Sequence, residues 1–248
     1  MRRDGRPVPR LYVDSPLGAD LSVPLVENQN HYVARVMRLG QGDGVRLFNG
    51  RDGEWLALLD GAQAVCSEQL RPQPAGDGPW LLFAPPKRDR LRFLVEKATE
   101  LGVGRLMPVT TERTEPPTVK TQKMRDWAQE AAEQCGRCDL PDCLEQAPLQ
   151  GVLEVWPADR SLLLCDESGG GKPLNQVIER PSAFLVGPEG GFAPQEFDRL
   201  RAHERIVPVS LGSHILRIET ACLAALASWH LRSSGASVVH TSGGAPTS

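Results

Sequence analysis

The stretch from Leu185 to Leu231 is the feature that most constrains the fold of this 248-residue chain. Two short apolar segments, Ala183 to Val186 and Ile206 to Val209, each end in a glycine-containing loop that is followed by a helical pattern. A strand, a glycine loop and a helix in succession are typical of open α/β sheets, whose ligands bind beyond the carboxyl ends of the strands. We therefore interpret this stretch as part of an α/β sheet and as the candidate active site.

The alternation of strands and helices extends back to Trp80. Further predicted strands are Trp80 to Ala84, Arg105 to Val109 and Ser161 to Cys165, with a weaker one near Cys143. The predicted helices are Arg88 to Leu101, Thr121 to Gln134, Pro194 to His203 and Leu216 to Leu231. This alternation predicts one α/β domain over residues 80–233 with a mainly parallel sheet. Residues 234–248 are small and polar, which predicts a disordered tail.

The chain before residue 73 has a different, β-rich pattern. Short predicted strands lie at Leu11 to Val13, Val45 to Phe48 and Trp55 to Leu59, and one predicted helix, Glu27 to Leu39, interrupts them. Short strands around one helix predict a small β-barrel domain over residues 1–72. The segment from Arg71 to Pro79 is rich in proline and glycine and is predicted to be a linker.

Composition and charge favour a soluble protein of the cytoplasm. Hydrophobic residues make up 40% and charged residues 24% of the chain. No apolar run approaches the roughly 18 to 20 residues of a membrane span, and the first residues lack the apolar core of a signal peptide. The net charge of −3 argues against a general nucleic-acid coat, although local basic patches remain compatible with RNA binding.

The six cysteines are interpreted as reduced thiols, and no metal site is predicted. Cys135 and Cys138 have the spacing of a metal-binding or redox pair. A structural zinc site needs four ligands, however, and only Cys143 lies nearby, with no histidine beside it. The pair also follows a helical segment and not a strand, so we interpret these thiols as incidental.

Neither glycine-rich loop carries a familiar phosphate-binding pattern. Residues Gly169 to Pro173 lack the GxxxxGK[ST] spacing and are interpreted as a flexible connector, while Gly187 to Gly191 do not match GxGxxG. Glycines without a Cβ nevertheless allow the backbone to approach a ligand closely. Two such loops at adjacent strand ends therefore predict a pocket for a flat heterocycle. Its expected apolar walls are Leu185, Leu211, Ile215 and Leu216.

Two motifs in this stretch resemble the signature of a known enzyme family. Residues 187–192 are GPEGGF, and residues 211–221 contain Leu-Gly, Ile-Leu-Arg and Glu-Thr-Ala. Further matching segments are RVMRL at 35–39, KATELGV at 97–103, Glu-Arg at 112–113 and EQCGR at 133–137. Together they resemble the RsmE family of the SPOUT superfamily, over nearly the whole chain except the C-terminal tail. Members of that family methylate N3 of one uridine in 16S ribosomal RNA.

The resemblance implies a fold, a cofactor and partners. It implies an N-terminal PUA-like β-barrel that binds RNA, a C-terminal SPOUT α/β domain with a trefoil knot, and a homodimer. S-adenosylmethionine is the implied cofactor, and 16S rRNA in the small ribosomal subunit is the implied substrate. Two alternatives stay open: a non-catalytic ribosome-assembly or RNA-binding factor, and a SPOUT methyltransferase with another RNA target.

The two motifs and the basic residues supply the candidate site residues. Methyl transfer to N3 needs alignment of the reactants, and the N3 proton must leave. Arg217 is expected to stabilise the charge on uracil or hold a phosphate, and Glu219 is expected to orient Arg217 or act as the base. The candidate cofactor-binding residues are Leu185, Gly187, Pro188, Glu189, Gly190, Gly191, Leu211, Gly212, Ile215, Leu216 and Thr220. The candidate RNA-binding residues are Arg10, Arg35, Arg38, Lys87 and Arg137.

The chain departs from the family pattern at three places. Ser213 and His214 stand where Pro-Arg is usual, so a cationic role at position 214 requires a protonated histidine. Ile218 replaces a usual threonine. Ala193 occupies a position often filled by a serine that caps the following helix, at a typical cost of about 1 kcal/mol.

Overall fold

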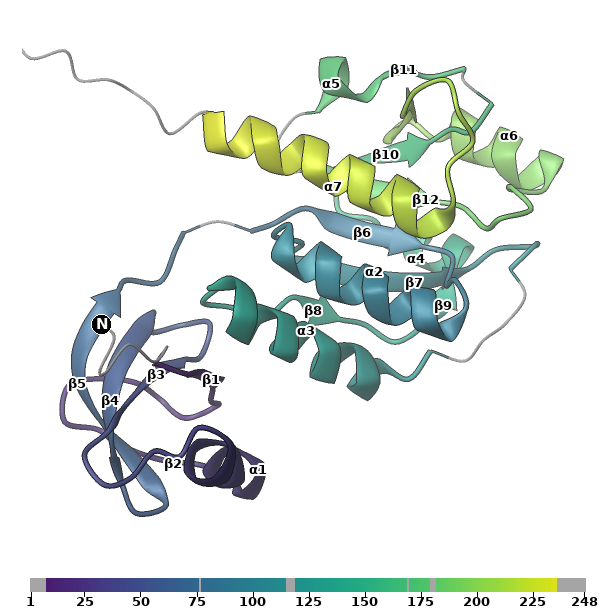
Figure 1. Cartoon of the computed structure of the whole chain (residues 1–248). Helices are drawn as coiled ribbons and strands as arrows, with labels where there is room; N and C mark the ends of the chain where they lie inside the picture. The colour runs from purple at the N-terminus through teal and green to yellow at the C-terminus, as the bar shows by residue number, and fades with distance from the viewer. Residues whose placement is uncertain (1–7, 76, 115–118, 169, 179–181, 236–248) are drawn as a thin grey trace, which may run out of the picture.

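The described residues form two β-sheets, one before residue 72 and one from residue 80 onward (Figure 1). The structure is a computed structural model that describes residues 8–75, 77–114, 119–168, 170–178 and 182–235. Part of the tail predicted from residue 234 is helical, because the last helix ends at Gly235, and residues 236–248 lie outside the described residues. Within the described part, no helix is both long and apolar enough to span a membrane.

The N-terminal sheet is curled and mainly antiparallel. Its strand order is β1-β3-β4-β5-β2, and the pairing of β1 with β3 is parallel. Alternate residues of β3, including Val45 and Leu47, are fully buried and form the core of this domain, as the period-2 pattern of a half-buried strand requires. The bounds are β1 (Arg10–Tyr12), β2 (Ser22–Pro24), β3 (Gly44–Phe48), β4 (Glu54–Asp60) and β5 (Gln63–Arg71).

The predicted helix from Glu27 to Leu39 is two short helical segments. Helix α1 (Glu27–His31) continues directly into the π-helix η1 (Tyr32–Val36). The helix ends before Leu39, because Arg38 adopts a φ of 55°, a left-handed conformation that terminates helical hydrogen bonding. A π-helical turn is rare and is not visible in hydrophobic periodicity.

The C-terminal sheet is parallel throughout. Its order is β11-β13-β10-β12-β6-β7-β8, with β9 paired to β7. Its strands are β6 (Trp80–Phe83), β7 (Arg105–Thr110), β8 (Asp142–Cys143), β9 (Ala147–Pro148), β10 (Ser161–Cys165), β11 (Lys172–Pro173), β12 (Ser182–Val186) and β13 (Ile206–Ser210). The helices are α2 (Arg88–Glu100), α3 (Thr121–Cys135), α4 (Leu149–Glu154), α5 (Leu174–Val177), α6 (Pro194–Ala202) and α7 (Ile218–Gly235). The mixed α/β fold predicted from the alternation is therefore confirmed.

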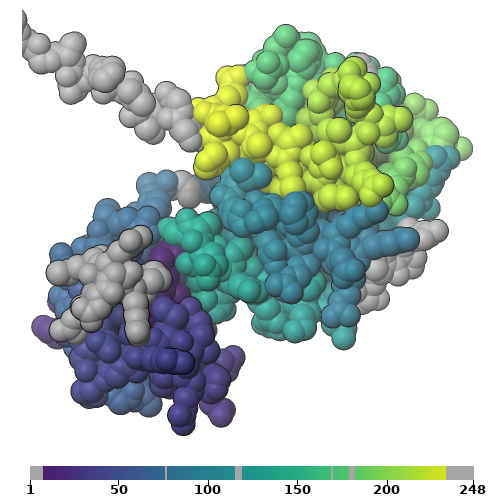
Figure 2. All heavy atoms as spheres, in the orientation of Figure 1, coloured from purple at the N-terminus to yellow at the C-terminus, as the bar shows by residue number. Residues whose placement is uncertain are grey.

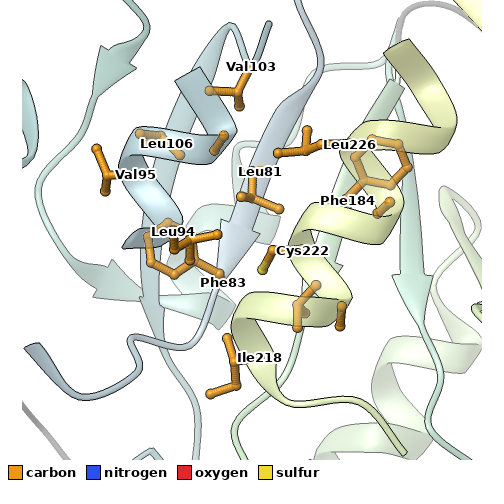
Figure 3. Packing of buried hydrophobic residues seen from close by; sticks show 14 of the residues in the cluster. Leu81, Phe83, Leu94, Val95, Val103, Leu106, Phe184, Ile218, Cys222 and Leu226 are labelled. Atoms are coloured by element: carbon orange, nitrogen blue, oxygen red, sulfur yellow. The ribbon is translucent and has the colours of Figure 1, made fainter. Parts of the chain in front are cut away.

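Each face of the parallel sheet packs against helices. Leu81 and Phe83 of β6 point to the face covered by α2 and α7, where they meet Leu94 and Cys222 (Figure 3). Leu82, between them in sequence, points to the opposite face and joins a separate buried cluster that includes Leu200 of α6. Successive strand side chains face opposite sides, so one strand contributes to both cores.

The order of the last strands brings distant loops together. The chain leaves β12, forms α6 and enters β13, which lies on the far side of β10 from β12. It then returns as α7, which packs on β12, β6 and α2 (Figure 1). Because the strands are parallel, the loops after β6, β10, β12 and β13 all lie at the same edge of the sheet.

Gly171 is held close to the sheet and is not part of an open connector. A Cβ on Gly171 would lie 2.5 Å from the backbone nitrogen of Val209 in β13. The residues that follow, Lys172 and Pro173, form β11 and pair with β13. The flexible-connector interpretation is therefore wrong for Gly171, because this glycine allows one backbone to approach another.

The N-terminal domain contacts the C-terminal end of α3. Figure 2 shows the N-terminal domain, in purple and blue, against the teal segment that contains α3. Helix α3 ends at Cys135, and the next residue, Gly136, adopts a φ of 85°, the left-handed conformation that caps a helix C-terminus. The contact places the start of β1 beside the last turn of α3.

Candidate active site

A cavity of about 540 Å³ lies at the carboxyl edge of the parallel sheet. Its walls come from the loops that follow β6, β10, β12 and β13, together with the start of α7. This volume is within the range of small-molecule sites, which span roughly 300–1,000 Å³. The lining includes both glycine-containing loops that the sequence predicts to be the site.

The first glycine loop follows β12 and is tightly packed. A Cβ on Gly187 would lie 2.6 Å from the ring of Phe192, so a side chain at this position would force that ring to move. Gly191 adopts a φ of 65°, and its amide donates a hydrogen bond to the carbonyl oxygen of Pro188 at 2.9 Å. Arg113 donates to the carbonyl oxygen of Gly190 at 3.0 Å. The loop therefore has a defined shape that side-chain substitution would disturb.

The second glycine loop follows β13 and is more open. Gly212 has a φ of 125°, and its amide donates to the hydroxyl of Ser210 at 3.2 Å. Ile215 is 82% exposed although it lines the cavity, and Leu216 beside it is partly buried. An exposed apolar side chain at a cavity mouth is suited to cover a bound ligand.

A third wall, which sequence reasoning missed, comes from the residues after β10. Asp166, Glu167 and Ser168 line the cavity, and the side chain of Asp166 is fully buried. Arg201 lies 2.6 Å from Asp166, whose other oxygen accepts the amide of Ser168 at 2.8 Å. Burial alone would raise the pKa of Asp166, but these hydrogen bonds outweigh it and hold the pKa below the usual value. The carboxylate of Asp166 is therefore ionised at neutral pH and paired with Arg201.

Arg90 of α2 connects the first glycine loop to the start of α7. Its Nη1 lies 2.9 Å from Glu189, and its Nε lies 3.6 Å from Glu219. The second carboxylate oxygen of Glu219 is buried and has no hydrogen-bond partner within the described residues. The sequence shows Arg90 only as one cation of a basic segment, and nothing local reveals partners about 100 residues away.

Arg217 and Glu219 lie close in sequence but have different surroundings. Arg217 is exposed and lines the cavity, and no acidic side chain pairs with it in the described part of the chain. Glu219 is mostly buried and pairs with Arg90, so the expectation that it orients Arg217 is not met in the structure. Residues two apart at a helix start point in different directions, which explains the separation.

Most of the predicted cofactor-binding residues line the cavity, and three do not. The lining set is Gly187, Pro188, Glu189, Gly191, Leu211, Gly212, Ile215 and Leu216. Leu185 is fully buried in the core beneath α6, and Thr220 is exposed on α7. Gly190 is held by Arg113 but does not line the cavity. Ile218, the departure from the family threonine, is buried against the core (Figure 3).

The five candidate RNA-binding residues fall into two groups. Arg35 and Arg38 are exposed on and just after η1, and Lys87 is exposed at the mouth of the cavity. Arg10 and Arg137 have side chains only 10% and 11% exposed, and both donate hydrogen bonds within the protein. Their buried positions make them parts of the interdomain junction, which charge alone does not reveal.

The cysteines near the end of α3 are distributed between surface and interior. Cys135 is exposed, whereas Cys138 and Cys143 are buried. Burial raises the pKa of Cys138 and raises that of Cys143 to about 12, so both remain protonated thiols at neutral pH. Across the described ranges, no group of three or more potential ligands is placed to hold a metal ion.

Comparison with known families matches both domains. Residues 79–230 match the family described as RNA methyltransferase domain, and residues 27–63 match the family described as RNA methyltransferase PUA domain. A ribosomal RNA small subunit methyltransferase E from Rickettsia conorii is 31% identical over 231 residues, which cover 88% of this chain and 93% of the relative. Its namesake from Synechocystis is 32% identical over 236 residues, covering 88% and 76% of the two chains.

Solved structures of similar proteins extend the match to the fold. A ribosomal RNA small subunit methyltransferase E from Neisseria gonorrhoeae, bound to S-adenosyl methionine, has a TM-score of 0.79 and 28% identity and covers 91% of this chain and 98% of its own. A Legionella pneumophila methyltransferase in complex with the same cofactor has a TM-score of 0.74 and 26% identity, with coverages of 92% and 98%. The chain belongs to the RNA methyltransferase family that includes ribosomal RNA small subunit methyltransferase E, the RsmE family.

Proposed function

We propose that this protein transfers a methyl group from S-adenosylmethionine to N3 of one uridine in 16S rRNA of the small ribosomal subunit. The observation that supports it most directly is the cavity at four neighbouring strand ends, in a fold shared with relatives solved with that cofactor. A homodimer, a knotted path through the last three strands and a cytoplasmic location belong to the same proposal. They rest on the family, and the return of α7 across the sheet supports the knotted path alone.

The chemistry of the cavity fits S-adenosylmethionine. The backbone at Gly212, with nothing within 4 Å of its Cβ position, leaves room for a flat ring, and Leu211 and Leu216 supply apolar contact. The cofactor carries positive charge at its sulfur and its ammonium group, and the carboxylates of Asp166 and Glu167 lie on the wall after β10. When bound, the cofactor supplies a methyl group activated by the positively charged sulfur.

Arg217 is the residue best placed to act on the substrate. Its exposed guanidinium at the cavity lacks an acidic partner among the described residues, so it is available to stabilise negative charge on uracil after the N3 proton leaves. Glu219 is proposed as the proton acceptor: it lies just outside the cavity lining, it pairs with Arg90, which lines the cavity, and one of its oxygens has no hydrogen-bond partner among the described residues. Arg90 holds the other oxygen and keeps that carboxylate in place.

The proposed RNA-binding surface runs from the N-terminal domain to the mouth of the cavity. Arg35, Arg38 and Lys87 are exposed cations available for phosphate contacts. The target base is buried in RNA structure when it is paired, so it must be presented unpaired or flipped to enter the cavity. The N-terminal domain is therefore expected to fix the position of the RNA while the base is in the cavity.

Nucleoside analysis of small-subunit RNA tests this proposal. RNA from cells with and without the gene would be digested and analysed by mass spectrometry, and 3-methyluridine is expected to disappear without the gene. If a different methylated nucleoside disappears without the gene, the enzyme has another RNA target. If no nucleoside changes and calorimetry detects no binding of S-adenosylmethionine, the chain is a non-catalytic assembly or RNA-binding factor.

A further inference from the structure

Glu54 is a buried carboxylate that pairs with two arginines of the N-terminal domain. Its side chain, at the first position of β4, is 1% exposed. The Nε of Arg10 lies 2.5 Å from one oxygen, and the Nε of Arg71 lies 2.7 Å from the other. Burial alone would raise the pKa of Glu54, but the two arginines hold it below its usual value, so the carboxylate is charged at neutral pH.

Both arginines extend from the N-terminal sheet to the end of α3. Arg10 donates three further hydrogen bonds and Arg71 donates one, all to backbone carbonyl oxygens at or just beyond the last turn of the helix. The last carbonyls of a helix lack partners within the helix and carry partial negative charge, so cations stabilise them. The acceptors are the carbonyl oxygens of Ala132, Glu133, Gly136 and Arg137, at 2.7, 3.1, 2.8 and 2.8 Å.

Helix α3 connects this junction to the wall of the cavity. It packs on α2 through small buried residues such as Ala128, and α2 carries Arg90. Arg137, in the loop after α3, donates to the carbonyl oxygen of Thr99 near the end of α2 at 3.1 Å. The orientation of the N-terminal domain is thus set against the helix pair that supports the cofactor cavity.

Two backbone amides also cross the junction. The amide of Tyr12 donates to the carboxylate of Glu133 at 3.1 Å, and the amide of Gly50 donates to the carbonyl oxygen of Cys138 at 2.9 Å. These bonds join the two domains directly, and neither involves the side chain of Glu54, Arg10 or Arg71. They therefore report whether the junction is closed.

We propose that Glu54 is a positioning residue for the RNA substrate. By fixing both arginines on the end of α3, it holds the N-terminal domain at the angle that delivers bound RNA to the cavity. The inference rests on the proposed function, because it assigns the N-terminal domain the role of holding RNA. It predicts that loss of the carboxylate frees the domain to rotate while the cofactor cavity stays intact.

A purely local role for Glu54 predicts a different result. If Glu54 only stabilised the N-terminal sheet, its loss would loosen the pairing of β4 with β5 as much as the junction. Hydrogen exchange of individual amides by NMR separates the two roles, because each amide reports its own opening. The comparison is between the amides of Tyr12 and Gly50 and those of the β4–β5 pairing.

The test uses Glu54→Gln in the full chain, because glutamine keeps the shape and removes the charge. The amides of Tyr12 and Gly50 are expected to lose almost all of their protection, because the closed junction becomes the minor state, with the β4–β5 amides unchanged. The KM for small ribosomal subunits is expected to rise about tenfold, as for a binding-competent arrangement populated about a tenth of the time. The kcat at saturating subunits and the affinity for S-adenosylmethionine should not change. The control is Asp126→Asn, which removes an exposed ion pair within α3.

Two outcomes would overturn the proposal: equal loss of protection in the β4–β5 pairing, or unchanged protection of Tyr12 and Gly50. If Glu54→Gln does not fold, Arg71→Gln provides the same test, because it removes a half-exposed partner and one bond to α3. The exchange measurement needs no activity. If the wild-type protein does not methylate 16S rRNA, the proposed function fails. The exchange measurement then still decides whether Glu54 holds the junction closed.

Discussion

The interdomain junction and the cavity at the edge of the parallel sheet both have a carboxylate paired with arginine, but the two pairs differ in burial. At the junction, Glu54 is 1% and Arg10 is 10% exposed, and both carboxylate oxygens have an arginine partner. At the cavity, Arg90 is 34% and Glu189 is 55% exposed, and Glu219 keeps one buried oxygen without a partner in the described residues. Both oxygens of the carboxylate are therefore paired at the junction, whereas one oxygen of Glu219, beside the cavity, has no partner among the described residues.

This difference indicates that the two regions differ in rigidity. A buried charge with all its partners holds one geometry, because any opening leaves a charge uncompensated. A half-exposed pair is weak and rearranges at little cost when a ligand binds. We infer that the junction is rigid in the free protein and that the loops around the cavity adjust to the cofactor and the RNA.

Arg10→Ala should have the largest effect on stability. It leaves Glu54 buried with Arg71 as its remaining arginine partner, and it removes two hydrogen bonds to the last carbonyls of α3 and one to the carbonyl of Arg137 just beyond the helix. We expect the free energy of unfolding to fall by about 3–5 kcal/mol, the usual loss when one partner of a buried pair is removed. Urea denaturation measures it, with Lys123→Ala on the exposed face of α3 as the control. A loss below about 0.5 kcal/mol, typical of surface changes, would contradict the idea of a rigid junction.

Arg217→Ala should lower the methylation rate strongly and change stability little, the reverse of Arg10→Ala. The guanidinium is exposed and no acidic group pairs with it in the described ranges, so stability should change by less than about 0.5 kcal/mol. The single-turnover rate of methylation of small ribosomal subunits should fall about 100-fold, as when one donor to a developing negative charge is removed. Lys123→Ala again serves as the control. A near-wild-type rate would exclude the catalytic role of Arg217.

Arg90→Gln tests whether the pairs at the cavity are as weak as their exposure indicates. It removes the connection between Glu189 and Glu219, and we expect the affinity for S-adenosylmethionine to fall about fivefold, or about 1 kcal/mol. Arg92→Gln, two residues along α2, breaks an exposed pair with Glu96 and should leave the affinity unchanged. Calorimetry measures both. A loss of several hundredfold would mean that the cavity pair is as rigid as the junction.

The sequence predicts those helices and strands that are long enough for their hydrophobic period to be recognised. The long helices α2, α3 and α6 and the buried strands of the parallel sheet lie within a few residues of their predicted bounds. Helices α4 and α5 are too short to show a helical period, and β8, β9 and β11 are too short to show an alternation. Their positions are set by contacts with neighbouring strands, which local patterns do not contain.

The site was predictable where its chemistry is local, and not where it depends on strand order. The glycine loops after β12 and β13 are motifs in one stretch of chain, and both line the cavity. Asp166 follows a strand that the sequence also predicts, but only the order β13-β10-β12 shows that this strand lies between the other two. Arg10 and Arg137 have the charge expected of RNA contacts, and only tertiary packing shows that they are buried.

The helix end at the junction and the helix end beside the cavity also differ in how their backbone groups are capped. The C-terminal end of α3 is capped by arginines from another domain, whereas the N-terminal end of α6, beside the cavity, begins at Ala193 without a side-chain cap. A serine there would accept an amide hydrogen bond from the first turn of α6. The start of α6 is therefore a local weakness next to the first glycine loop.

Ala193→Ser should give the smallest effect and a stabilising one. We expect the free energy of unfolding to rise by about 0.5–1 kcal/mol, because the hydroxyl satisfies an amide that Ala193 leaves without a cap. Thermal and urea unfolding measure the gain, and Ala193→Val, which offers no hydroxyl, is the matched control. If the loop after β12 must adjust when the cofactor binds, the serine should also slow cofactor release in stopped-flow measurements. A more stable protein with unchanged release would show that the end of α6 does not take part in that adjustment.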